Sequence, residues 1–233
     1  MVYGFLKRLF VESCPGCGGS SGSGFCTVCA AELARIASPC GRCGLPEPVA
    51  RCPRRRTHWH VDAVHAPFAY APPLDHYLHA FKYRGARVLG RAFGALIAPA
   101  LQAPSAAVDA LVAVPLHRGR LRERGYNQAF EIARALAREV GLPVLERGIV
   151  RSAATGAQTG RGARERLAGM TQAFRVRRAL DGLDIAIVDD VVTTGATINA
   201  LAAALRAAGA RSCIAFAVAR APERRPDSQA RNV

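Results

Sequence analysis

The sequence predicts an α/β protein in which helices flank a parallel sheet, preceded by a small cysteine-rich module. An uninterrupted apolar run at residues 185–188 leads through a short loop into a helical pattern, as expected for a buried parallel strand and the helix after it. Seven of the eight cysteines lie before residue 53. The 233 residues, half of them hydrophobic, suffice for one α/β domain and a small module. We expect the module at residues 1–60, the α/β domain at 61–221 and a disordered basic tail at 222–233.

The early cysteines form two sets with the same internal spacing. The first set consists of two C-x2-C pairs, Cys14 with Cys17 and Cys26 with Cys29. Each pair directs two thiolates to one point, about 2.3 Å from a zinc ion, so two pairs complete a tetrahedron. We interpret this set as a structural zinc site. A disulfide framework is disfavoured by the odd cysteine count and the missing signal peptide.

The second set contains Cys40, Cys43 and Cys52, but Arg55 stands where a fourth cysteine would complete the pattern. Either His58 or His60 could supply the fourth ligand of a second zinc site. The alternative is a decayed site that holds no metal. Crossed ligation, in which the first pair of one set joins the first pair of the other, also stays open.

The chain is strongly basic, with 32 Lys and Arg against 17 Asp and Glu. Arginines are concentrated between Arg147 and Arg178, a stretch that contains one acid, Glu165. The simplest explanation is a solvated basic face on a protein from an arginine-rich proteome. The alternatives are a polyanionic small substrate or nucleic acid, and charge alone does not choose between them.

The N-terminal stretch Met1–Ser13 is apolar, but Lys7 and Arg8 interrupt it. It is too short and too charged for a signal peptide. No run of 18 uncharged apolar residues is present, so we expect no membrane span and a cytoplasmic location.

Hydrophobic periodicity predicts the order of the elements in the α/β domain. Strands are expected at residues 61–71, 108–115 and 212–218, and helices at 74–84, 88–101 and 126–140. A loop at 116–125 should follow the second strand and lie beside the ligand edge of the sheet, because ligands bind beyond the carboxyl ends of such strands. The segment 151–174 lacks clean periodicity and is interpreted as a mobile loop over the site.

The segment Leu183–Thr197 carries the clearest functional signal. Its strand ends in two adjacent carboxylates, Asp189 and Asp190, and a helix starts a few residues later. A helix N-terminus presents backbone N–H groups and a positive dipole end to an anion. The acidic pair suits vicinal hydroxyls or a metal ion, so the segment predicts a ligand with both a ribose and a phosphate.

This segment resembles the phosphoribosyl pyrophosphate (PRPP) motif of type I phosphoribosyltransferases, which have a Rossmann-like fold. The resemblance implies that Asp189 and Asp190 bind the ribose hydroxyls at the catalytic centre. It implies that the 5′-phosphate binds the turn formed by Thr193, Thr194, Gly195, Ala196 and Thr197. In this setting the cations Arg118, Arg122, Arg124 and Lys82 are placed to meet pyrophosphate, although Lys82 also fits a plain helix C-terminus.

The chain as a whole resembles the ComF family of phosphoribosyltransferase-like proteins with an N-terminal zinc ribbon. The resemblance rests on the cysteine sets, on Phe81-Lys82-Tyr83 with Gly85, on Val114–His117, on Arg122 with Arg124–Gln128, on Thr155 with Gln158, on Arg166, and on the PRPP motif. Two positions depart from the family pattern, Gly169 where asparagine is usual and Gln172 where glycine is usual.

The ComF resemblance implies a PRPP-binding protein that uses Mg²⁺ to transfer or bind phosphoribosyl groups, with a role in DNA uptake during natural transformation. Its partners would then include single-stranded DNA and DNA-uptake proteins such as a ComF-operon helicase. The alternative is a non-catalytic competence factor that binds single-stranded DNA and keeps the fold as a scaffold.

Overall fold

The fold was analysed in a computed structural model that describes residues 12–22, 24–47, 52, 59–103, 107–151 and 173–222. His58, nearly all of the predicted mobile loop and nearly all of the predicted tail lie outside these residues. The predictions made for those parts therefore stay predictions.

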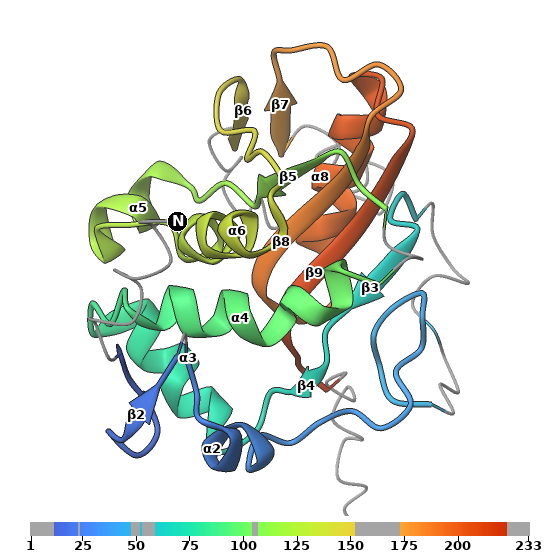
Figure 1. The fold of residues 1–233 in the computed structure, drawn as a ribbon. Coiled ribbons are helices and arrows are strands. Elements are labelled where there is room, and N and C mark those ends of the chain that lie inside the picture. The colour runs from blue at the N-terminus through green and yellow to red at the C-terminus, as the bar shows by residue number, and fades with distance from the viewer. Residues whose placement is uncertain are drawn as a thin grey trace, which may run out of the picture.

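A parallel sheet forms the centre of the fold (Figure 1). Its strands follow the order β3-β9-β8-β5, and a short strand, β4, also pairs with β9. Their bounds are Ala63–His65 for β3, Phe68–Ala69 for β4, Ala110–Ala113 for β5, Asp184–Val192 for β8 and Ser212–Arg220 for β9. The last of these strands in the chain, β9, thus lies between β3 and β8.

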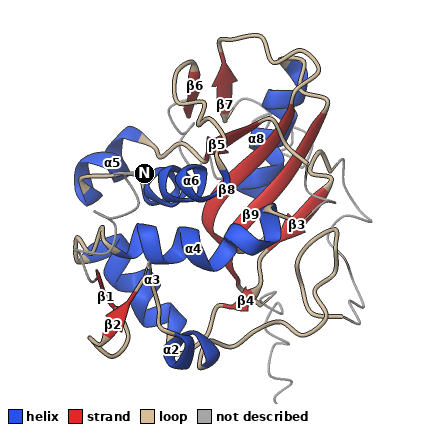
Figure 2. Ribbon diagram, in the orientation of Figure 1, coloured by secondary structure: helices blue, strands red, loops and turns tan. Residues whose placement is uncertain are grey.

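Helices cover both faces of this sheet, as the sequence predicted (Figures 1 and 2). One face packs against α3 (Leu74–Tyr83), α4 (Leu89–Leu101) and α6 (Gln128–Val140), and the other packs against α8 (Ala196–Ala207). The strand β8 is buried from both sides, and the four residues from Ile185 to Val188 have no exposed surface. Such burial explains why this strand is an unbroken apolar run.

Two predicted elements differ from the structure. The strand expected at 61–71 is two short strands, β3 and β4, which are separated at Ala66 and Pro67. Proline lacks the N–H that a sheet ladder needs, so the pairing is interrupted there. The loop expected at 116–125 is largely a helix, α5 (Arg118–Arg124). It is capped by His117, whose Nδ1 accepts the amide of Gly119 at 3.2 Å, and arginine is a good helix former.

The cysteine segment packs directly on the α/β domain. Its described residues contain β1 (Glu12–Ser13), β2 (Ser20–Ser21) and α2 (Thr27–Ala31) and are otherwise mostly loop (Figure 2). The Phe25 ring lies 5.0 Å from the Tyr77 ring of α3 and 6.4 Å from the Phe93 ring of α4. Further along, the amide of Ile36 donates to the carbonyl of Pro67 at 2.9 Å. Ring contacts and a backbone hydrogen bond therefore join the cysteine segment to the α/β domain.

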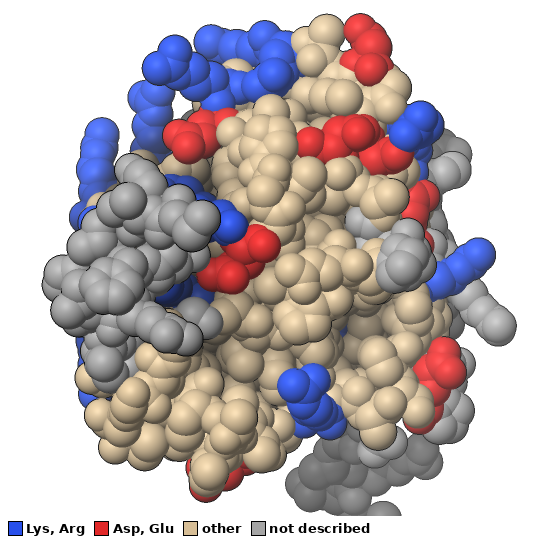
Figure 3. All heavy atoms as spheres, in the orientation of Figure 1, with Lys and Arg blue, Asp and Glu red and all other residues tan. Residues whose placement is uncertain are grey.

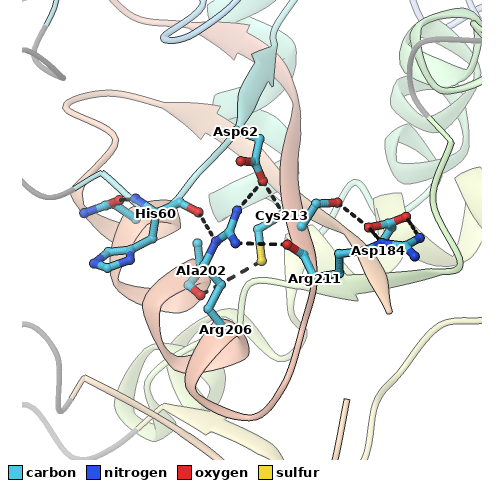
Figure 4. A network of polar contacts seen from close by, with 9 residues as sticks. His60, Asp62, Asp184, Ala202, Arg206, Arg211 and Cys213 are labelled. Atoms are coloured by element: carbon cyan, nitrogen blue, oxygen red, sulfur yellow. Dashed lines mark hydrogen bonds and ion pairs between the residues drawn. The ribbon is translucent and has the colours of Figure 1, made fainter. Parts of the chain in front are cut away.

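The chain that leads from the cysteines into β3 is held by α8 and β9 (Figure 4). Arg206 on α8 donates to the carbonyl of His60 at 2.9 Å and pairs with Asp62 at 2.5 Å. The Asp62 carboxylate also accepts the amide of Cys213 on β9 at 2.8 Å. These contacts fix residues 60–62 at the amino end of β9.

A separate two-stranded antiparallel sheet is formed by β6 (Ile149–Arg151) and β7 (Phe174–Val176). The helices of the described residues are all too short or too polar to cross a bilayer.

Candidate functional site

A cavity of about 390 Å³ lies at the carboxyl ends of β5 and β8. In open α/β sheets this is the edge at which ligands bind. Its wall contains two carboxylates, two threonines, four cations and two tyrosines: Asp189, Asp190, Thr193, Thr197, Lys82, Arg120, Arg124, Arg151, Tyr70 and Tyr83. The cavity thus presents groups that accept hydrogen bonds from hydroxyls beside groups that bind an anion.

The two carboxylates lie near the end of β8, and one of them is paired with a lysine. The Nζ atom of Lys82, at the end of α3, is 3.0 Å from Oδ2 of Asp190, a residue that is only 8% exposed. The amide of Asp190 donates to the Asp189 carboxylate at 2.9 Å. Burial and then the adjacent Asp190 carboxylate raise the pKa of Asp189, against the opposing effects of Lys82 and Arg151. Hydroxyl donors or a cation in the cavity would therefore favour the charged form of Asp189.

The turn between β8 and α8 has the geometry of an anion-binding site. Gly195 has a φ of +80° and precedes the first residue of α8, so the first N–H groups of that helix have no partner within it. Thr193 and Thr197 line the cavity, whereas Thr194, Gly195 and Ala196 do not. The Thr194 hydroxyl instead accepts the amide of Ala196 at 3.3 Å.

A tryptophan packs against this turn from outside the cavity wall. A methyl group placed on Gly195 would lie 2.5 Å from Cη2 of Trp59, closer than two carbon atoms approach without overlap. Glycine at this position therefore serves two needs, the left-handed backbone and the close approach of the indole ring.

The four cations predicted to meet pyrophosphate divide into two groups. Lys82 and Arg124 line the cavity with the acidic pair. Arg118 lines a neighbouring cavity instead, and Arg122 lines neither of these two cavities and is exposed. The helical form of α5 explains the division, because residues two positions apart point to different sides of a helix.

Among the charged and tyrosine residues of the cavity wall, four were not named as site residues in the sequence analysis: Arg120, Arg151, Tyr70 and Tyr83. Arg120 was detectable, because it is four positions before Arg124 and shares its face once α5 is recognised as a helix. Arg151 is the last residue of β6 and the first residue of the segment expected to lie over the site. The guanidinium of Arg124 lies 5.0 Å from the Tyr83 ring centre and donates to the Tyr83 hydroxyl at 3.2 Å, which fixes the position of this cation.

The first cysteine set is gathered into one cluster. The sulfur atoms of Cys14, Cys17, Cys26 and Cys29 all lie within 4.8 Å of one another. The Cys14 sulfur accepts the amides of Cys26 at 3.2 Å and Gly16 at 3.4 Å. Burial raises the pKa of the Cys14 thiol, but the backbone amides outweigh it and lower the value to about 6. Four converging sulfurs, one of them stabilised as a thiolate, fit a structural zinc ion.

The second set forms its own cluster, in which the sulfurs of Cys40, Cys43 and Cys52 also lie within 4.8 Å of one another. The two separate clusters contradict crossed ligation between the sets. Among the described residues, His60 is not part of the second cluster, and its amide donates to Asn199 of α8 at 2.6 Å. The three thiols fit three of the four ligands of a zinc ion.

Exposed arginines gather around β6 and β7, where Lys and Arg side chains stand at the top of Figure 3. Those in the described residues are Arg147, Arg175, Arg177 and Arg178. They belong to the basic stretch noted in the sequence and lie in or next to the β6–β7 strand pair, which brings Arg151 to the cavity.

Comparisons with known proteins identify the class. The sequence matches the family model described as "Phosphoribosyl transferase domain" over residues 124–233. It is 33% identical over 201 residues to the DNA utilization protein YhgH of Salmonella typhimurium, covering 80% of this chain and 86% of that protein. It is 29% identical over 217 residues to Competence protein F of Haemophilus influenzae, covering 89% and 90%. It is 27% identical over 184 residues to Competence protein ComFC of Bacillus subtilis, covering 75% and 74%.

The parallel sheet, the cavity at its carboxyl edge and the matched domain together define a protein with a phosphoribosyltransferase fold. The cysteine clusters at its N-terminus fit a zinc ribbon. Within that class, the chain belongs to the ComF family, which confirms the resemblance found in the sequence.

Proposed function

We propose that this protein binds PRPP with Mg²⁺ in the cavity at the end of β8 and transfers or holds its phosphoribosyl group. The observation that carries the proposal is that the acidic pair and two threonines of the turn, Thr193 and Thr197, line one cavity together with Lys82 and Arg124. A ribose phosphate needs groups that accept hydrogen bonds from its hydroxyls and a nearby site for its phosphate, and the cavity contains both.

Each part of PRPP has a matching part of the wall. The 5′-phosphate would bind the turn from Thr193 to Thr197 at the N-terminus of α8. The ribose hydroxyls would donate to Asp189 and Asp190, and Lys82 would exchange its contact with Asp190 for one with the pyrophosphate. Arg124 would bind the pyrophosphate as well, and its planar fork suits two oxygens at once.

Mg²⁺ fits the carboxylate oxygens of Asp189 and Asp190, bound directly or through water, and would help neutralise the pyrophosphate. During transfer the bond between C1 and the pyrophosphate oxygen breaks, pyrophosphate leaves with the bonding electrons, and the acceptor forms a new bond to C1. The carboxylates near the sugar favour the positive charge that develops on the ribose ring. No side-chain nucleophile is needed for this step.

PRPP binding is tested by calorimetry with MgCl2 present. We expect Asp189→Asn/Asp190→Asn to abolish binding that the wild type shows. The matched control is Asp184→Asn, which changes the same residue type at the opposite end of the same strand and should leave binding unchanged. Absence of binding to the wild type, or equal binding by the double variant, would refute the proposal.

We further propose that the protein acts in DNA utilisation, since its relatives are named for DNA utilisation and competence. A second candidate function, in which the fold is a scaffold for single-stranded DNA, is favoured by the exposed arginines around β6 and β7. DNA-uptake proteins such as a helicase would then be its partners.

A single-stranded DNA titration over a salt series separates the two functions. A steep salt dependence, unchanged in Asp189→Asn/Asp190→Asn, together with no PRPP binding, would support the scaffold. PRPP binding that the double variant loses would support the first proposal.

We also propose that zinc occupies the first cysteine cluster, and the second as well if a fourth ligand completes it, and that the protein resides in the cytoplasm, where thiols stay reduced. Elemental analysis should give one zinc per chain, or two if the second cluster also binds. A zinc content of zero would refute the metal proposal.

A further inference from the structure

A buried arginine joins the second cysteine cluster to the turn that we assign to the 5′-phosphate. Arg220 is the last residue of β9 and only 3% of its surface is exposed. Its Nε donates to the carbonyl of Cys43 at 2.8 Å. Its NH1 group is shared among the carbonyls of Val192 at 3.0 Å, Ala221 at 2.8 Å and Thr193.

The turn side of this contact reaches the cavity. Val192 ends β8 and is paired in register with Arg220, and Thr193 is the first threonine of the turn and lines the cavity. These two carbonyls belong to the last residue before the anion-binding turn and to the first residue of the turn. Their orientation sets where the N–H groups and hydroxyls of the turn point.

On the side of the second cysteine cluster, the connection depends on one residue. Cys43 supplies its carbonyl to Arg220 and its sulfur to the second cysteine cluster. The knuckle around it is closed by the amide of Gly44, which donates to the carbonyl of Cys40 at 2.7 Å, and it is joined to β3 by the amide of Val64, which donates to Gly41 at 3.1 Å. A ligand bound to the Cys43 sulfur therefore holds the peptide whose carbonyl Arg220 uses.

We propose that Arg220 is a positioning residue that transmits the state of the Cys40–Cys43–Cys52 cluster to the sugar-phosphate turn. Metal bound to the cluster fixes the Cys43 carbonyl, Arg220 stays extended between the two segments, and the turn keeps its binding geometry. Loss of the metal frees the Cys43 carbonyl and loosens the turn. The proposal deepens the proposed function, because its effect on affinity presupposes that the cavity binds PRPP.

The chemistry of the side chain makes the proposal specific to arginine. A guanidinium carries its donors in a rigid planar fork, so one side chain can hold carbonyls of two segments at once. A lysine would keep the charge but present a single flexible ammonium. We therefore expect Arg220→Lys to break the connection while keeping the charge.

The decisive experiment is a double-mutant cycle on the full chain with zinc supplied, measuring PRPP affinity and zinc content. Cys52→Ser removes one thiol of the cluster without altering the hydrogen-bonded knuckle that contains Cys43. We expect Cys52→Ser and Arg220→Lys each to weaken PRPP binding about tenfold, as for the loss of one or two hydrogen bonds. The double variant should bind PRPP no more weakly than either single variant, because both changes break the same connection.

Two controls separate transmission from general damage. Cys17→Ser acts on the first cluster, so its effect on affinity should add to that of Arg220→Lys. Arg211→Lys changes an exposed arginine near the other end of the sheet, which pairs with Asp184, and should leave affinity unchanged. Arg220→Lys should also keep the wild-type zinc content, which a variant that simply misfolds would not do.

Hydrogen exchange of the amides from Val191 to Thr197 tests the connection without any ligand. Cys52→Ser and Arg220→Lys should both speed exchange in this stretch, and the double variant should match them. If Cys52→Ser leaves this exchange unchanged, or if the two effects add, the proposal is overturned. If the wild type does not bind PRPP but the exchange pattern is as expected, the proposed function fails while the connection stands.

Discussion

The contact between Gly195 and Trp59 leads to a quantitative prediction for Gly195→Ala. The alanine would have to keep a φ of +80°, which costs about 1–2 kcal/mol for a residue with a side chain. Its methyl group would lie 2.5 Å from Cη2 and 3.2 Å from Cζ3 of the indole. Relieving such overlap in packed surroundings costs about 1–3 kcal/mol. We therefore expect Gly195→Ala to lower the free energy of unfolding by about 2–5 kcal/mol.

A second glycine provides a matched control. Gly141 ends α6 with a φ of +74°, and an added methyl group there would meet nothing within 4 Å. Gly141→Ala should therefore lower the free energy of unfolding only by the cost of the left-handed backbone, about 1–2 kcal/mol. The difference between the two variants measures the overlap with Trp59.

The assay is urea unfolding followed by far-ultraviolet circular dichroism, because the indole itself is perturbed. A Trp59→Leu background completes the test, since removing the ring should abolish the overlap and leave Gly195→Ala no worse than Gly141→Ala. If the two glycine variants lose the same stability in the wild-type background, the packing of Trp59 on the turn is refuted.

Three further outcomes are expected. Lys82→Met removes the cation of the Lys82–Asp190 pair, so calorimetry should show PRPP binding about ten- to a hundredfold weaker, and an unchanged affinity would remove Lys82 from the site. Hydrogen bonds from Arg211 and Ser212 lower the pKa of Asp184 to about 2; since an unfolded Asp titrates near pH 4, the stability advantage of wild type over Asp184→Asn is present above about pH 4 and should shrink as the pH falls toward about 2, as measured by urea midpoints. Trp59 is the only tryptophan of the chain, so PRPP should change its fluorescence, and a flat titration with calorimetric binding would contradict its place beside the turn.

The features that sequence could predict are those encoded by neighbouring residues. The run from Ile185 to Val188 is buried on both faces, and burial on both faces leaves an unbroken apolar pattern. The acidic pair and the turn after it are consecutive, so their shared cavity follows from one strand and one helix. The two cysteine clusters likewise follow from spacing, because each knuckle is closed by bonds within a few residues.

The remaining features depend on contacts between distant segments. Arg220 and Cys43 are 177 positions apart, and neither residue type signals the other. Arg118 and Arg122 were assigned to the site because the segment was treated as a loop, in which any arginine can turn inward. A helix removes that freedom and sends alternate side chains away from the cavity.

The strand order has a consequence for folding during synthesis on the ribosome. The strand β3 pairs only with β9 in the described part of the sheet, and β9 is also the neighbour of β8. Some 150 residues therefore separate β3 from the partner that completes its ladder. Until β9 has been synthesised, the edges of β8 and β3 with which it pairs stay open to strands of other chains. Premature termination should therefore produce fragments that aggregate.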